Sequence, residues 1–148
     1  GSHAASHEEF IKQHVFLQQV IATLKFGRVI FISSIAVYGN HSTPINIDSC
    51  YCNPSIYGQA KLAQEFLIKS CADYVIIRPT YIYGNGMGKN SLLPIWVQHA
   101  LNSSKITVYG NGARWQDYLH VDDLVDLCEK KKKKGGNHTV IAATGKSY

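Results

Sequence analysis

The sequence lacks the patterns that mark metal-binding and disulfide-rich chains. Its 148 residues hold four cysteines and seven histidines, with no Cys-x-x-Cys pair and no His-Glu-x-x-His. Cys50 and Cys52 are separated by a single residue, too close for the usual ligand spacing. We therefore expect one of these thiols to point inward and the other outward, and we expect no metal site.

Long apolar runs are also absent. No stretch approaches the roughly 20 residues that a helix needs to cross a membrane, and the start shows no basic-then-apolar signal pattern. The apolar content of 45% is nevertheless sufficient for the packed core of one domain. These features predict a cytoplasmic protein with no membrane partner.

The excess of positive charge is confined to one place. The formal net charge is +5, and the run Lys130–Lys134 supplies five of the fifteen basic residues. The other ten basic residues are matched by ten acidic ones. Because a lysine run at the end of a helix is usually a solvated last turn, we do not expect a nucleic-acid partner.

Helical and apolar stretches alternate along the chain. Continuous apolar runs at residues 28–33 and 74–79 are typical of parallel strands covered on both faces. Weaker strands are expected at 106–110 and 138–143. Helices are expected at 8–24, 55–70, 92–101 and 122–132. This alternation predicts an α/β fold with right-handed crossovers.

Polar and glycine-containing segments follow the two strongest predicted strands. They are "SSIAVYGN" (33–40) and "TYIYGNGMG" (80–88). Ligands of open α/β sheets bind beyond the carboxyl ends of the strands, so both segments are expected at a ligand-binding edge. Residues 40–53 show no periodicity and are expected to form a loop of the kind that often carries function.

Tyr57 and Lys61 lie one turn apart on a predicted helix and so share a face. A nearby ammonium stabilises a phenolate, which would let the tyrosine act as a general acid or base. Ser33 and Ser34 could hydrogen-bond the same substrate oxygen. Taken alone, this pair is better explained as exposed helix surface.

The combination of motifs is far more specific than the pair. The motifs are Ser33-Ser34, Val37-Tyr38-Gly39, Tyr57-x-x-x-Lys61, Arg78-Pro79 and "GNGARWQDYLHVDD". With them the chain resembles, over nearly its whole length, the extended short-chain dehydrogenase/reductases of the NAD-dependent epimerase/dehydratase family. The resemblance implies a partial Rossmann-type doubly wound parallel sheet in residues 1–84. It also implies a small substrate-binding lobe in residues 85–148, whose last helix and strand can return to the main sheet.

The resemblance also implies residue roles. Tyr57 would be the acid/base, Ser34 would bind the substrate oxygen, and Lys61 would hold the nicotinamide ribose. The cofactor would be NAD or NADP. Its further contacts would be Ala4, Ala5, Ser33, Pro79, Thr80 and Tyr81.

Departures from the family pattern reduce the number of reactions that we expect. Ile35 and Ala36 stand where the sugar 4,6-dehydratases carry Asp-Glu, which disfavours dehydration. Gln116 stands where many members have an arginine on the substrate diphosphate. Arg114 is therefore the candidate anion contact, since guanidinium suits phosphate oxygens, and a plain surface arginine is the alternative. We expect a nucleotide-sugar epimerase or a related reductase.

A glycine-rich turn of the form Gly-x-Gly-x-x-Gly, which would cradle the cofactor pyrophosphate, is missing. Its absence predicts a fragment of a longer enzyme. Two alternatives stay open: a non-catalytic cofactor-sensing or RNA-binding relative, and an inactive piece. A sheet cut short in this way would expose one edge to pairing, which favours a homodimer.

Overall fold

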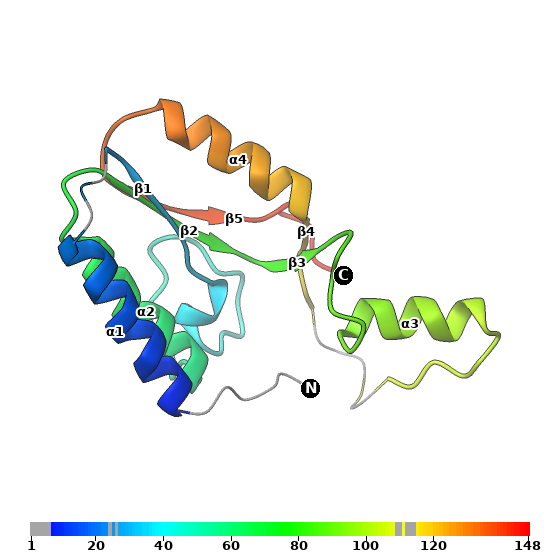
Figure 1. The fold of residues 1–148 in the computed structure, drawn as a ribbon. Coiled ribbons are helices and arrows are strands. Elements are labelled where there is room, and N and C mark those ends of the chain that lie inside the picture. Colours follow the sequence, from blue (N-terminus) through cyan, green and yellow to red (C-terminus); the bar gives the residue numbers. More distant parts are fainter. Residues whose placement is uncertain (1–6, 24, 26, 109–110, 112–114) are drawn as a thin grey trace.

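The computed structural model describes residues 7–23, 25, 27–108, 111 and 115–148. In Figure 1, α4 covers one face of a three-stranded sheet, α2 covers the other, and α1 packs on the outside of α2. The helices are α1 (His7–Thr23), α2 (Ile56–Ile68), α3 (Leu92–Leu101) and α4 (Val121–Lys133), with a short 3-10 helix η1 (Ile35–Tyr38). The strands are β1 (Val29–Ile32), β2 (Tyr74–Pro79), β3 (Tyr81–Tyr83), β4 (Tyr118–His120) and β5 (His138–Ala142).

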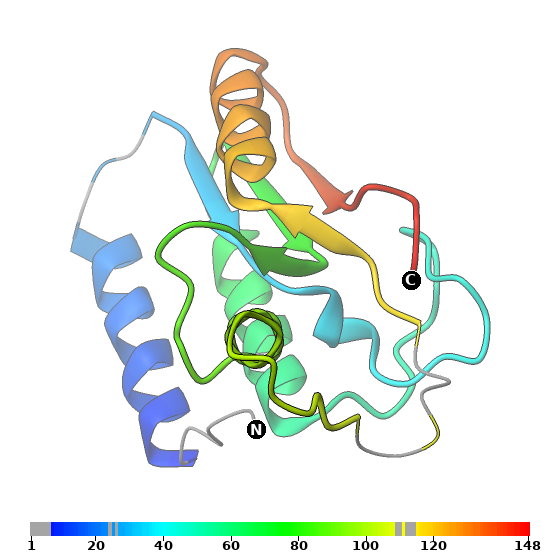
Figure 2. The ribbon, with the colours of Figure 1, turned by 90° about the vertical axis from the view of Figure 1, so that its right-hand side faces the viewer.

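The main sheet has the order β1-β2-β5, and both pairings are parallel. The carboxyl ends of its strands therefore meet at one edge, which Figures 1 and 2 show on the side towards β3 and η1. A second, two-stranded parallel sheet joins β3 to β4. The mixed α/β architecture with parallel strands confirms the predicted fold class, and β5 brings the end of the chain back to the main sheet.

Strand β2 is buried on both faces, as the continuous apolar run predicts. Val75 and Ile77 pack with Leu124 of α4 on one face. Arg78, one residue on, points to the opposite face because successive side chains of a strand alternate. There it meets Glu65 of α2. The core thus has an apolar half under α4 and a partly polar half under α2.

The four predicted helices are confirmed to within one or two residues at each end. The lysine run is the last turn of α4, as expected. None of the helices in the described part of the chain is long and apolar enough to cross a membrane.

Of the two weaker strand predictions, one is confirmed and one is wrong. The one at 138–143 is confirmed by β5, whereas the one at 106–110 is wrong over 106–108, which are not strand; residues 109–110 lie outside the described part. Strands β3 and β4 were not predicted. Each has three residues, too few to show a period of two, and each is stabilised by a partner some 35 positions away.

Candidate active site

The first of the two predicted site serines lies inside the protein. Ser33 follows β1 directly, is 3% exposed, and its backbone N–H donates to the carbonyl oxygen of Ile77 at 2.7 Å. Its hydroxyl donates to Oε1 of Glu65 at 2.6 Å. Ser33 thus joins the end of β1 to the middle of α2, and its contact with a cofactor stays a prediction.

Ser34 has extended backbone and caps η1, where its Oγ accepts a hydrogen bond from the N–H of Ala36 at 3.1 Å. The side chain is half-buried. A hydroxyl that accepts one hydrogen bond still carries its own O–H, which can donate to a ligand oxygen. Ser34 is therefore held in place and remains chemically able to bind a substrate hydroxyl or carbonyl.

Tyr57 lies in the first turn of α2 and is 44% exposed. Its ring lies against that of Phe10, with 6.2 Å between the centroids. The next residue, Gly58, has no side chain to hold α2 away from η1: a Cβ there would lie 2.2 Å from the carbonyl oxygen of Ala36. This close approach brings the turn that carries Tyr57 against the segment that begins at Ser34.

Lys61 reaches the same region from the next turn of α2. Its Nζ donates to the carbonyl oxygen of Ile32 at 3.0 Å, one residue before Ser33, and lies 5.1 Å from the centroid of the Phe31 ring. Burial lowers the pKa of the Lys61 ammonium, and the charge of Glu65 opposes that shift. Because an ammonium has three donors, two remain for a ligand at the carboxyl end of β1.

The predicted cofactor contacts after β2 lie at the same edge. Pro79 ends β2, and Thr80 donates from its hydroxyl to Oδ1 of Asp117 at 2.7 Å. Tyr81 opens β3, where its ring meets Tyr118 edge to face at 5.3 Å. Ala4, Ala5 and Arg114 lie outside the described residues.

Asp117 holds the end of the chain to this edge, a role that the sequence did not predict. Besides Thr80, its carboxylate accepts from the hydroxyl of Thr144 at 2.7 Å and from the N–H groups of Thr144, Gly145 and Lys146 at 3.1, 2.8 and 3.2 Å. Burial raises the pKa of Asp117, but the hydrogen bonds from Thr80, Thr144 and Gly145 outweigh it and the net shift is downward.

A buried ion pair beneath Ser33 was also missed. Arg78 donates from Nε and Nη2 to the two carboxylate oxygens of Glu65 at 2.9 and 2.6 Å, and their side chains are 4% and 1% exposed. Arg78 also donates to the hydroxyls of Tyr38 and Tyr51 at 2.7 and 3.1 Å. An arginine inside an otherwise apolar strand was the available signal, since a buried guanidinium needs a buried partner.

The titration of this cluster follows from its geometry. Burial works against the charge of Arg78, yet the hydrogen bonds and charge of Glu65 raise the pKa of the guanidinium above its ordinary value. Burial likewise raises the pKa of the Tyr38 hydroxyl, against the opposing effect of Arg78. Arg78 is therefore protonated and the Tyr38 hydroxyl is neutral at physiological pH.

The expectation that Cys50 and Cys52 point in opposite directions was wrong. Their Sγ atoms lie 3.4 Å apart on one side of the loop, and Tyr51 between them points inward to Arg78. In extended backbone, residues i and i+2 share a side, which explains the arrangement.

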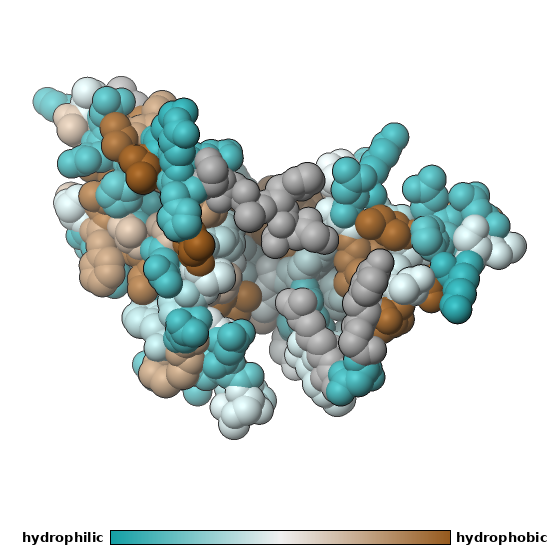
Figure 3. All heavy atoms as spheres, turned by 90° about the horizontal axis from the view of Figure 1, so that it is seen from below, coloured by the Kyte–Doolittle hydropathy of each residue, from teal (hydrophilic) through white to brown (hydrophobic). Residues whose placement is uncertain are grey.

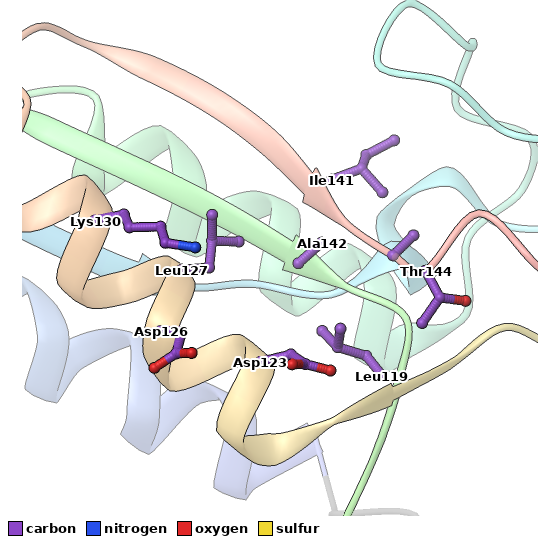
Figure 4. A pocket seen from close by; sticks show the side chains of 9 residues that line it. Leu119, Asp123, Asp126, Leu127, Lys130, Ile141, Ala142 and Thr144 are labelled. Atoms are coloured by element: carbon purple, nitrogen blue, oxygen red, sulfur yellow. The ribbon is translucent and has the colours of Figure 1, made fainter.

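A separate cavity of ≈ 370 Å³ lies between α4 and β5 (Figure 4), on the opposite face of the sheet from α2. Its rim combines the carboxylates of Asp123 and Asp126 with the ammonium of Lys130 over apolar side chains. It is lined by none of the predicted catalytic residues, so the candidate active site is the strand edge described above.

Comparison with known proteins identifies the family. The model of the NAD dependent epimerase/dehydratase family matches residues 3–142, nearly the whole chain. The chain therefore belongs to that family, whose cofactor is NAD.

Two curated relatives illustrate the range of the family. The chain is 31% identical to a probable GDP-L-fucose synthase of Oryza sativa subsp. japonica, over 85% of this chain and 47% of the relative. It is 26% identical to a dTDP-D-glucose 4,6-dehydratase of Dictyostelium discoideum, over 81% of this chain and 32% of the relative. The chain thus spans 32% to 47% of the length of these relatives.

A solved structure shares the fold. A UDP-glucuronic acid 4-epimerase from Bacillus cereus, in complex with UDP-glucuronic acid and NAD, matches with a TM-score of 0.81 at 21% identity. The match covers 100% of this chain and 52% of the epimerase. At this identity the match shows the fold alone.

Proposed function

We propose that this chain forms the nicotinamide- and sugar-binding side of an NAD-dependent nucleotide-sugar epimerase or related reductase. The observation that carries the proposal is the approach of α2 to the end of β1. Lys61 donates to the carbonyl of Ile32, and Gly58 lets the turn of Tyr57 pack on η1, the element that follows Ser34.

Each side chain has a distinct task in this proposal. Tyr57 exchanges a proton with the sugar hydroxyl at the reacting carbon, and Ser34 donates its O–H to the same oxygen. Lys61 donates to the ribose hydroxyls and stabilises the phenolate form of Tyr57 by its charge. NAD, when bound, supplies the hydride acceptor for that carbon. Ala4, Ala5, Ser33, Pro79, Thr80 and Tyr81 are further candidate cofactor contacts, and Arg114 is the candidate substrate anion contact.

The described residues fit one part of the cofactor. The two remaining donors of Lys61 and the half-exposed Tyr57 suit the nicotinamide ribose. The 148 residues contain no Gly-x-Gly-x-x-Gly turn for the pyrophosphate. We therefore propose that this chain recognises the cofactor chiefly through its nicotinamide half.

Epimerisation or reduction is favoured over dehydration. The names of the relatives do not agree on one reaction, since four are glucose 4,6-dehydratases, one is a probable synthase and one, in Escherichia coli, is a dTDP-4-dehydro-6-deoxyglucose reductase. The two residues after Ser34 are the apolar Ile35 and Ala36. By the family resemblance, the sugar 4,6-dehydratases carry Asp-Glu at these two positions. Neither side chain can transfer a proton.

Cofactor binding is tested by titrating the purified chain with NADH and following the cofactor fluorescence. We expect saturable binding that Lys61→Met weakens at least tenfold, because the ribose donors are lost. Lys69→Met removes an exposed lysine at the end of the same helix and is the matched control. Equal affinities for the two variants would contradict the role of Lys61, and no binding by the unaltered chain would contradict cofactor recognition by this chain.

Proton transfer is tested separately, by turnover of nucleotide sugars in the presence of NAD. We expect Tyr57→Phe to lower kcat by about 10²–10⁴-fold while leaving NADH binding intact. Tyr74 begins β2, at the end of the strand away from the candidate site. Tyr74→Phe is therefore the control and should keep full turnover. Unchanged kcat in Tyr57→Phe would rule out this residue as the acid/base.

A further inference from the structure

The loop between η1 and α2 gathers three metal-ligating side chains that the proposed function does not use. One ligand atom each from His41, Cys50 and Cys52 lies within 4.8 Å of the other two. The two Sγ atoms are 3.4 Å apart. Among the residues that the structure describes, this is the group of three His, Cys, Asp or Glu side chains that converges closely enough to hold an ion.

The backbone of the loop fixes both thiols. Cys52 donates from its N–H to the carbonyl of Tyr38 at 2.7 Å and accepts at its own carbonyl from the N–H of Asn40 at 2.9 Å. Tyr51 is anchored inward, where its hydroxyl accepts from Arg78. Because Tyr51 is held on the inner side, its two neighbours are held together on the outer side.

The close pairing of Cys52 with the segment after η1 requires a glycine. Gly39 pairs with Cys52 in a parallel bridge and has φ = 75°, and a Cβ there would lie 2.0 Å from the carbonyl oxygen of Cys52. The far side of the loop is tied as well, since Asn46 accepts from the N–H of Asp48 at 2.9 Å and the hydroxyl of Tyr38 donates to the carbonyl of Ile47 at 3.1 Å. These hydrogen bonds hold the backbone of the loop that carries His41, Cys50 and Cys52.

One ring nitrogen of His41 contacts the backbone of the same loop. Its Nε2 lies 2.9 Å from the carbonyl oxygen of Cys50, and its ring meets that of Tyr38 edge to face at 6.5 Å. A metal-binding histidine usually donates its other ring N–H to a carbonyl or carboxylate, which fixes the ring and the tautomer. When Nε2–H donates to Cys50, Nδ1 keeps its lone pair for a metal.

We propose that His41, Cys50 and Cys52 form a binding site for one Zn²⁺ ion, with a fourth coordination position left to solvent. Thiolate and imidazole are the ligands that zinc prefers, at about 2.3 Å for sulfur and 2.0–2.1 Å for nitrogen. Tetrahedral ligands at those lengths lie roughly 3.4–3.8 Å apart by the same geometry. Two sulfurs take the upper end of this range, about 3.8 Å, so the observed 3.4 Å requires the two thiols to move apart by roughly 0.4 Å. The bound ion would tie the loop together beside the start of α2.

A disulfide between the two cysteines explains the arrangement less well. Its bond length is about 2.05 Å, so the sulfurs would have to approach further across a single intervening residue. It would also give the imidazole of His41 no part in the site. A three-ligand ion site accounts for all three side chains.

The site is tested with Zn²⁺ on the reduced, chelator-treated chain, by titration calorimetry. We expect one ion per chain, and at least a tenfold loss of affinity in each of Cys50→Ser, Cys52→Ser and His41→Ala. Cys71→Ser and Cys128→Ser remove the other two free thiols and are matched controls that should bind as the unaltered chain does. Circular dichroism of the metal-free variants checks that each is folded.

A second measurement needs no variant. Zn²⁺ should protect Cys50 and Cys52 from alkylation while Cys71 and Cys128 react at an unchanged rate, as read by peptide mass spectrometry. Failure of the reduced chain to bind Zn²⁺ would overturn the proposal. So would Cys50→Ser and Cys52→Ser variants that bind Zn²⁺ as tightly as the unaltered chain. Full affinity in His41→Ala would overturn the three-ligand site. None of these outcomes depends on whether the chain binds NAD.

Discussion

Arg78 and Glu65 show how single residues support the candidate site from beneath. Burying a guanidinium or a carboxylate costs several kcal/mol unless the partner and the hydrogen bonds are well placed. Here both carboxylate oxygens accept from Arg78, and Ser33, Tyr38 and Tyr51 complete the cluster. The serine segment, the loop and α2 therefore meet at one charged pair.

Removing one partner of this pair should be strongly destabilising. Glu65→Ala leaves an unpaired guanidinium in the interior, and we expect the free energy of unfolding to fall by about 3–5 kcal/mol. Urea denaturation measures the change. Glu8→Ala breaks an exposed i,i+4 pair with Lys12 on α1 and is the control, expected to change stability little. Similar effects for both variants would contradict the buried pair.

Asp117 predicts a pH dependence. Its pKa is lower in the folded chain than the ordinary value of 3.8, so its contribution to stability is present above that value and is lost as the pH falls through the folded pKa. Asp117→Asn should therefore be less stable than the unaltered chain at pH 7, and the difference should shrink below about pH 4. Urea unfolding from pH 7 to 3 tests this, and a difference that stays constant would count against it.

At the scale of elements, the contact between α2 and η1 determines where Tyr57 lies. Helix α2 begins at Ile56 with the hydroxyl of Ser55 accepting from the N–H of Gly58 at 3.3 Å, so its first turn is fixed by a cap. Helix η1 is fixed by the equivalent bond from Ala36 to Ser34. Two capped elements meet where Gly58 has no side chain.

Gly58→Ala should break this contact. Alanine favours a helix by about 1 kcal/mol over glycine, but its Cβ would collide with the Ala36 carbonyl. We expect a net loss of about 1–3 kcal/mol in the free energy of unfolding. Gly135→Ala, where a Cβ would have nothing within 4 Å, is the matched control for urea denaturation. A Gly58→Ala variant as stable as the original would show that the elements do not touch this closely in solution.

At the scale of the whole molecule, apolar surface remains uncovered beside α2. Ile11, Phe16 and Phe66 are 62%, 66% and 65% exposed on α1 and α2. Viewed from below in Figure 3, apolar side chains show among polar ones on the left, the side of α1 and α2. In the described part of the chain, β1 pairs on one side only. These features support the proposal of a homodimer.

Sedimentation equilibrium tests this proposal. We expect a dimer whose dissociation constant rises at least tenfold in Phe16→Ser, because the apolar area available for burial is reduced. Leu101→Ser, at an 80% exposed position on α3, is the matched control and should leave the association unchanged. A monomer at all concentrations would contradict the proposal.

The sequence by itself determined the elements whose signal is local. The apolar runs of β1 and β2, the four helices, and the spacing of Tyr57 and Lys61 on one face of α2 depend on residues a few positions apart. The family was evident from the same short motifs, and the match over residues 3–142 confirmed it.

The tertiary structure decided everything that joins distant parts of the chain. The pairing of β3 with β4, the burial of Glu65 against Arg78, and the hydrogen bonds of Asp117 each join residues separated by 13 to 37 positions. The direction in which Cys50 and Cys52 point depends on Tyr51 reaching Arg78, 27 positions away. Such contacts leave no periodic trace in the sequence, because their energy depends on which surfaces the packed elements bring together.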